Sequence, residues 1–148
     1  MRYFIIDGNN LIGKMPSVKS KDKNAEREKL AYILERYFFN KKVKVSLHFD
    51  GHTNLPIKVS GIKIFYSENQ TADDLIKNEI ERTSNRKNII LVSSDNNLKE
   101  FARVCSCEVK NSDDFGKDIT SSQNNDEEEN IIDSIKNIDE FKKLFGVD

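Results

Sequence analysis

The sequence alternates between short apolar runs and segments whose apolar residues recur at helical spacing. The runs are rich in β-branched and aromatic residues, which favour strands; they are Tyr3–Ile6, Val43–Phe49, Ile62–Tyr66, Ile89–Val92 and Cys107–Val109. The helical segments are Ala25–Phe39, Ala72–Arg82 and Leu98–Val104. Because strands that alternate with helices usually pair in parallel, the pattern predicts a three-layer α/β fold, with helices on each side of a mainly parallel sheet of about five strands.

The apolar runs differ in how deeply they predict each strand to be buried. The first and fourth are apolar at nearly every position, which is typical of strands buried on both faces. Val43–Phe49 instead alternates between apolar and polar residues, so we expect it nearer an edge or less fully covered on one side. The following link, residues 50–61, is too short for a regular crossover helix, and this connection is the least constrained part of the prediction.

The chain of 148 residues fits one domain, and its charge is unevenly distributed. Residues 1–112 carry 20 Lys and Arg against 14 Asp and Glu, a net charge of +6, whereas residues 113–148 carry 4 against 11, a net charge of −7. A basic body favours an anionic partner such as nucleic acid, although a solvated lysine-rich surface explains the same charge. No apolar run approaches the roughly 18–20 residues that span a bilayer, so we expect a cytoplasmic protein that does not enter a membrane.

The pattern divides the chain into three regions. We expect the folded domain over residues 1–117, an acidic flexible linker over 118–130 and a C-terminal helix over 131–148. The helix is predicted from the spacing of its apolar residues, which are Ile131, Ile135, Ile138, Phe141, Leu144 and Phe145. Such a face is buried against the body or against another chain, and the sequence leaves the oligomeric state open.

Four aspartates follow predicted strands or begin a helix: Asp7, Asp50, Asp73 and Asp95. Each one alone is explained as a turn former or helix cap. Together they fall where ligands bind in open parallel sheets, beyond the carboxyl ends of the strands. Clustered carboxylates repel unless a cation lies among them, and oxygen ligands suit Mg²⁺ or Mn²⁺. The predicted chemistry is therefore metal-assisted hydrolysis of a phosphodiester.

Two neighbouring aspartates at the start of the middle helix are assigned different roles. Thr71 and Asp74 form a capping-box pattern, in which Asp74 reaches back to the N-cap amide. Asp74 shares its face with Lys77, Asn78 and Glu81, whereas Asp73 shares its face with Ile76 and Ile80. We therefore assign Asp73 to the metal site and Asp74 to the helix.

Other polar residues flank the predicted site. Asn10 follows the first strand at a sharp turn, where Gly8 tolerates a positive φ and the amide can orient a carboxylate or contact a phosphate. Ser94 and His52 are candidate phosphate contacts, whereas His48 lies inside a strand and is expected to be structural. Four lysines after the first strand are candidate RNA contacts, although a solvated loop explains them equally well. They are Lys14, Lys19, Lys21 and Lys23.

Four segments occur together in the order and spacing of a known family. They are residues 3–13 (YFIIDGNNLIG), 49–52 (FDGH), 68–74 (ENQTADD) and 92–95 (VSSD). Over about residues 1–116 the chain resembles NYN domains, most closely the YacP-like branch of the PIN-like nucleases. The resemblance implies a PIN-like doubly wound sheet and a metal-dependent ribonuclease, which we expect to be an endonuclease.

The resemblance also implies roles for individual residues. Asp7, Asp73 and Asp95 fall on the family's acidic positions, with Asp50 and Asn10 as supporting residues. The implied partner is RNA, with mRNA and ribosome-associated RNA as candidate substrates.

Two other functions remain open. A catalytically weak RNA-binding module of the same fold would have no use for a repulsive set of carboxylates. An Asp-based phosphoryl-transfer protein also places aspartates at strand ends, but a dehalogenase-type site needs a second Asp at the position of Asn9. Phosphate transfer to an aspartate would support this last function, and RNA cleavage with Mn²⁺ would exclude it.

Overall fold

The computed structural model describes residues 1–125 and contains one five-stranded parallel sheet. Its strands are β1 (Arg2–Asp7), β2 (Val43–Phe49), β3 (Lys63–Tyr66), β4 (Ile89–Val92) and β5 (Glu108–Lys110). The spatial order is β3-β2-β1-β4-β5, so the first strand is central and the chain winds outward from it in both directions. The doubly wound sheet predicted from the sequence is confirmed.

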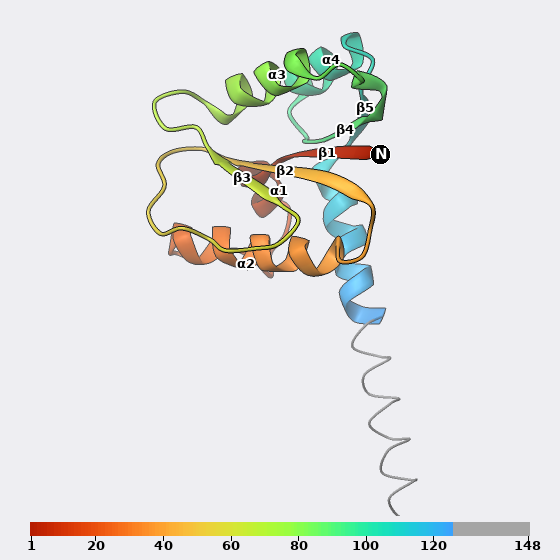
Figure 1. Ribbon diagram of the computed structural model, residues 1–148. Helices are drawn as coiled ribbons and strands as arrows, with labels where there is room; N and C mark the ends of the chain where they lie inside the picture. Colours follow the sequence, from red (N-terminus) through yellow and green to blue (C-terminus); the bar gives the residue numbers. More distant parts are fainter. Residues whose placement is uncertain (126–148) are drawn as a thin grey trace, which may run out of the picture. The chain divides into compact units, whose positions relative to one another are not determined.

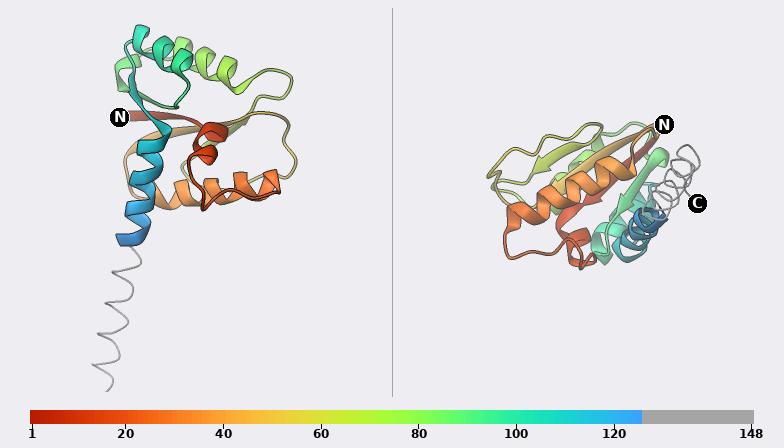
Figure 2. Two further views of the ribbon diagram at one scale, coloured as in Figure 1. Left: turned by 180° about the vertical axis from the view of Figure 1, so that it is seen from behind. Right: turned by 90° about the horizontal axis from the view of Figure 1, so that it is seen from below.

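Helices cover both faces of this sheet (Figures 1 and 2). The α-helices are α1 (Gly8–Gly13), α2 (Lys23–Tyr37), α3 (Ala72–Arg82) and α4 (Asn96–Val104), and a 3₁₀ turn, η1 (Arg86–Asn88), precedes β4. One face is covered by α3 and α4, and the other by α1 and α2. The spacing predicts α2, α3 and α4 to within two residues at each end, whereas the six-residue α1 replaces the simple turn expected after β1.

The core forms two layers because successive side chains of a strand point to opposite faces of the sheet. On one side Ile5 and Leu91 pack against Ile76 of α3 and Leu98 of α4. On the other side lie buried Leu47 and Phe49 of β2 and buried residues of α2, among them Leu30 and Leu34.

The alternation in β2 has a different cause from the one expected. β2 lies inside the sheet between β1 and β3, and its polar residues Ser46 and His48 are buried like their apolar neighbours. Residues 50–62 connect β2 to β3 without a helix, and the two strands still pair in parallel, from Ser46 opposite Lys63 to Phe49 opposite Tyr66. The sheet edge beyond β2 is therefore the short strand β3.

The region after β5 also differs from the prediction. Contacts divide the chain into two units, Met1–Gly116 and Lys117–Asp148. Residues 112–125 are helical, although the sequence predicts a linker from residue 118. Phe115 and Ile119, four residues apart, are both buried, and this short apolar pair is the helical signal in an otherwise polar stretch. Residues 126–130 of the predicted linker and the predicted helix at 131–148 lie outside the described residues.

This helix begins at Ser112, and its first residues, Phe115 among them, belong to the first unit. Its ring lies 6.0 Å from that of Phe4 and 6.1 Å from that of Phe38, centroid to centroid. None of the helices among residues 1–125 has the length and apolar character needed to cross a membrane.

Candidate active site

The carboxyl ends of the three central strands bring three of the predicted aspartates to one edge of the sheet. Asp7 is the last residue of β1, Asp50 follows β2 directly, and Asp95 follows β4 after two serines. Because β1 lies between β2 and β4, Asp7 occupies the middle of this edge. We call this set of three aspartates the acidic edge.

Asp7 is the least exposed member of the acidic edge. Burial raises the pKa of Asp7 from its ordinary value of 3.8 to about 6, and the negative charges of Asp50 and Asp95 act in the same direction. Hydrogen bonds to the carboxylate oppose this shift: Ser93 donates its hydroxyl to Oδ2 over 3.1 Å, and the backbone amide of Asn10 also lowers the pKa. The hydrogen bonds therefore hold the Asp7 carboxylate in place, while burial and the neighbouring charges make its ionised form less stable than in water.

Asp50 and Asp95 are exposed, and each uses one carboxylate oxygen to hold a helix. Asp50 Oδ1 accepts from the backbone amide of Ala72 over 2.7 Å, at the first residue of α3. Asp95 is the N-cap of α4, where its Oδ1 accepts from the amide of Leu98 over 3.1 Å. The structure thus gives Asp95 the capping role that the sequence also allowed for it, and its role in a site stays a prediction.

Asp73 lies in the first turn of α3, and its side chain is 39% exposed. Its Oδ2 pairs with Lys77 over 3.1 Å, although the sequence places Lys77 on the face of Asp74. Its Oδ1 is buried without a hydrogen-bond partner. Asp74 is exposed, and its amide donates to the hydroxyl of Thr71 over 3.1 Å, which is the Thr71 half of the predicted capping box.

The asparagines after β1 connect neighbouring strand ends. Asn10 Oδ1 accepts from the amide of Ser94 over 2.9 Å and from the hydroxyl of Ser112 over 2.6 Å. Asn9 Oδ1 accepts from the amide of Asp50 over 2.9 Å. These bonds give both residues a structural role at the acidic edge, and the side-chain oxygen of Asn10 is fully engaged by protein donors.

Gly8 was expected to allow a positive φ, but the structure requires a glycine at this position for a different reason. Its φ is not positive; the positive values among glycines belong to Gly51 and Gly61. A Cβ at position 8 would instead lie 2.7 Å from the carbonyl oxygen of His48 and 2.7 Å from the ring of Phe49. The close approach of α1 to β2 therefore demands a residue without a side chain.

The remaining predicted contacts lie around this edge. The Ser94 hydroxyl donates to Asp113 Oδ1 over 3.2 Å, and His52 Nδ1 lies 2.5 Å from Glu68 Oε2 on the surface. Lys14 pairs with Asp113 at 3.7 Å. Lys19, Lys21 and Lys23 are exposed, and Lys23 is the first residue of α2. Because α2 runs back across the sheet after β1, its N-terminus lies on the side of the acidic edge.

Arg27 is the residue of this region that the sequence analysis missed. It is buried in α2, its guanidinium donates to the carbonyl oxygens of Asp50 and His52, and it lies over the rings of Phe49 and Tyr66 at 5.5 and 5.3 Å. A signal was present, because Arg27 shares the apolar face of α2 with Leu30 and Leu34. Arg27 thus fixes the loop that carries Asp50.

The acidic edge supplies the oxygen donors that a hard divalent cation prefers. Two observations favour a cation there: the pKa of Asp7 is raised, in part by two other carboxylates, and Asp73 Oδ1 has no partner. Within residues 1–125, however, no three His, Cys, Asp or Glu side chains are arranged as a ready metal-binding group. Asp50 and Asp95 are exposed, so both side chains have room to change rotamer, and such a change would be needed to form a metal-binding group with Asp7.

The sequence was compared with models of known protein families. Residues 4–144 match the YacP-like NYN domain, which is nearly the whole chain. The chain belongs to the YacP-like NYN family. No curated protein matches this NYN domain in sequence.

Solved structures agree in fold. The crystal structure of Rae1 (YacP) from Bacillus subtilis has a TM-score of 0.69 to this NYN domain at 20% identity, and the match covers 99% of this chain and 93% of that one. The W164L mutant of Rae1 gives the same TM-score at 22% identity, covering 86% and 80% of the two chains. At these identities the likeness concerns the fold.

Proposed function

We propose that this protein is a metal-dependent ribonuclease that hydrolyses RNA phosphodiester bonds at the acidic edge, in endonucleolytic mode. The observation that carries the proposal is the environment of Asp7, a half-buried carboxylate whose pKa is raised to about 6 by burial and by Asp50 and Asp95. A structural aspartate has no need of two more carboxylates beside it. Membership of the YacP-like NYN family, a branch of the PIN-like nucleases, also supports hydrolysis of RNA.

We assign a separate role to each aspartate from the contacts of its carboxylate oxygens. Ser93 fixes Oδ2 of Asp7, while Asp50 and Asp95 each use one oxygen to accept from a backbone amide at the start of a helix and keep the other for a ligand. Asp73 adds a buried oxygen without a partner from the start of α3. Mg²⁺ or Mn²⁺ bound by these four aspartates would orient water and offset negative charge on the phosphate.

Other residues hold this arrangement and attract the substrate. Asn10 ties the turn after β1 to the residues that follow β4 and β5, and Arg27 holds the loop of Asp50. Exposed lysines at the start of α2 and before it would attract RNA by charge; Lys19, Lys21 and Lys23 form no ion pair within residues 1–125.

The experiment that tests the proposal compares nucleic acids and metals. The purified chain is incubated with single-stranded RNA, structured RNA and DNA of the same sequence, each with Mg²⁺, Mn²⁺ or chelator, and product ends are mapped. We expect internal cleavage of RNA that requires a divalent cation. Cleavage that persists in chelator, or no cleavage of any RNA, would contradict the proposal.

A second candidate function is an RNA-binding module with weak catalysis. Two observations favour it: Asp73 pairs with Lys77, and residues 1–125 hold no ready group of three metal-binding side chains. This module would bind RNA with the same affinity in chelator and in Mn²⁺, and would release no product in either.

A further inference from the structure

A groove beside α3 is not used by the proposed active site. It has a volume of about 560 Å³, within the range of ligand sites. Its floor includes Tyr3, Lys44, His48, Lys63 and Phe65 of the sheet, and Glu79 and Arg82 line it from α3 and the end of that helix. The groove exists because α3 packs on β1 and β2 and leaves this face of the edge strand β3 open.

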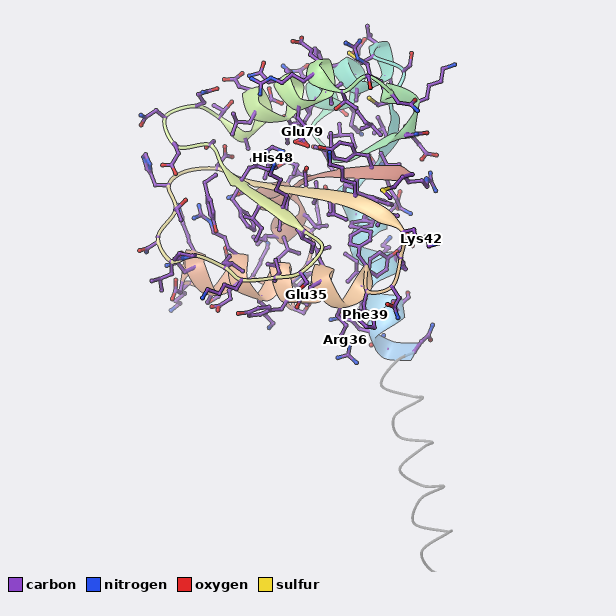
Figure 3. The ribbon with its side chains drawn as sticks, viewed as in Figure 1. Glu35, Arg36, Phe39, Lys42, His48 and Glu79 are labelled. Carbon is purple, nitrogen blue, oxygen red and sulfur yellow. The ribbon has the colours of Figure 1, made fainter. Side chains whose placement is uncertain are left out.

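The inner part of the groove holds a buried polar network. Glu79 Oε2 lies 3.1 Å from His48 Nε2, and Glu79 Oε1 accepts from the hydroxyl of Tyr3 over 2.5 Å. Figure 3 shows Glu79 and His48 facing each other between α3 and β2. Although burial opposes ionisation, the hydrogen bonds from His48, Tyr3 and Ser46 leave the pKa of Glu79 below its ordinary value. The only acid that lines the groove is thus an ionised carboxylate already engaged by protein donors.

His48 leaves one polar atom unsatisfied. Its side chain is 2% exposed, its ring stacks on that of Phe65 at 4.8 Å, and its Nδ1 has no hydrogen-bond partner. A buried polar atom without a partner costs about 1–3 kcal/mol.

Three cations surround this network and make no ion pair within the described chain: Lys44, Lys63 and Arg82. Lys44 Nζ lies 4.5 Å from the ring centre of Tyr3, and Lys63 Nζ lies 5.3 Å from that of Phe65, so both ammonium groups stay over the groove floor. Because Glu79 is engaged, the groove presents an excess of positive charge to whatever enters it. This charge favours an anion over a neutral or cationic ligand.

The groove lies along β2, one of the strands whose carboxyl ends form the acidic edge. His48 is opposite Asp7 in the β1–β2 register, and Lys44 lies four residues earlier on the same strand, or about 13 Å at the rise of a strand. The three cations come from three elements, β2, β3 and the end of α3, and line this one groove together. Cations on separate elements can contact more than one phosphate of a strand that lies along the groove.

We propose that the groove beside α3 binds single-stranded RNA that extends from the acidic edge, with its phosphates on Lys44, Lys63 and Arg82. The proposal rests on the proposed function, because it gives that substrate a second contact surface. It predicts that RNA long enough to reach the groove binds more tightly than RNA that occupies the acidic edge alone.

The test measures RNA binding without cleavage. All proteins carry Asp7→Asn and are kept in chelator, and a labelled single-stranded 12-nucleotide RNA is titrated by fluorescence anisotropy at several salt concentrations. The groove variant combines K44Q, K63Q and R82Q; the matched control combines K42Q, K58Q and K87Q, three exposed lysines that do not line the groove. Thermal unfolding of both variants establishes that each is folded.

We expect the groove variant to bind RNA about 10-fold more weakly or worse and to lower the slope of log K against log salt by about 2, at about 0.7 per phosphate contact. The control should stay within about 2-fold. Equal losses in both variants would overturn the proposal, since they would show a nonspecific effect of charge. Adenosine monophosphate serves as a competitor: displacement of RNA by it from the parent but not from the groove variant would identify a nucleotide pocket and also overturn the proposal.

The two proposals fail in different ways. If the chain with Asp7 intact cleaves no RNA but the groove variant still binds weakly, the groove stands and the ribonuclease proposal fails. If RNA is cleaved and the groove variant binds like the control, the ribonuclease proposal stands and the groove proposal fails.

Discussion

At the scale of single residues, Asp7 gives the most direct prediction about stability. Its pKa of about 6 in the folded chain lies above the ordinary 3.8, so ionising it costs folded-state free energy. The free-energy cost reaches its full value above pH 6, where Asp7 is ionised in the folded chain, and it disappears below pH 4, where Asp7 is protonated in both states. In chelator, Asp7→Asn should therefore raise the free energy of unfolding at pH 8 by up to about 3 kcal/mol, at about 1.4 kcal/mol per pKa unit, as measured by urea unfolding.

The gain should shrink as the pH falls from 7 to 4, because the parent then folds with Asp7 protonated. Asp74→Asn is the control: Asp74 is exposed, and its replacement should change stability by less than about 1 kcal/mol without this pH pattern. A gain from Asp7→Asn that is constant across the pH range would contradict the electrostatic explanation, as would a loss of stability at pH 8.

Arg27 is a second residue whose role can be tested. Arg27→Met keeps much of the apolar length of the side chain but removes the donors to the carbonyls of Asp50 and His52. We expect a loss of about 1–3 kcal/mol in the free energy of unfolding. Arg103→Met, at an exposed position of α4, should cost much less. Equal effects of the two changes would show that Arg27 does not hold the loop after β2.

The residues of the acidic edge could be placed from the sequence, but their partners could not. A strand followed by Asp predicts a carboxylate at the edge, because the position depends only on the strand and its direction. The ion pair of Asp73 with Lys77 and the bonds of Asn10 to Ser94 and Ser112 depend on rotamers and on strand order. Arg27 was missed because a charged residue on an apolar helix face is ordinarily expected to reach solvent.

At the scale of elements, the junction of β1 and α1 is the most sharply constrained. A Cβ at Gly8 would meet the backbone of His48 and the ring of Phe49, whereas a Cβ at Gly13, in the same helix, has no atom within 4 Å. Gly8→Ala should therefore destabilise the chain by about 1–3 kcal/mol or more, and Gly13→Ala should be neutral or stabilising by up to about 1 kcal/mol. Thermal unfolding of the two variants checks this difference, and similar melting temperatures would contradict the packing of α1 on β2.

Elements with a long apolar period were predictable and short ones were not. α3 matches its predicted range because Ile76 and Ile80 define its buried face and Thr71 its start. α1 has six residues, too few to show a period, and the helix over 112–125 presents only Phe115 and Ile119 in a polar stretch. In both cases tertiary packing, which the sequence pattern does not reveal, decides the helix.

At the scale of the whole molecule, the alternation of strands and helices was sufficient to predict a parallel sheet with helices on each side, and the resemblance to a known family supplied its doubly wound topology. In such sheets ligands bind where the chain reverses direction beside the first strand. The central position of β1 is thus the feature that brings Asp7, Asp50 and Asp95 to one edge.

The central claim is that this edge hydrolyses RNA, and the cleavage rate of a single-stranded RNA in saturating Mn²⁺ tests it most directly. The parent chain, Asp7→Asn and the control Asp74→Asn are compared under identical conditions. We predict that Asp7→Asn lowers the rate by about 10²-fold or more while Asp74→Asn stays within about 3-fold of the parent. A parent rate that Asp7→Asn leaves unchanged would contradict the account.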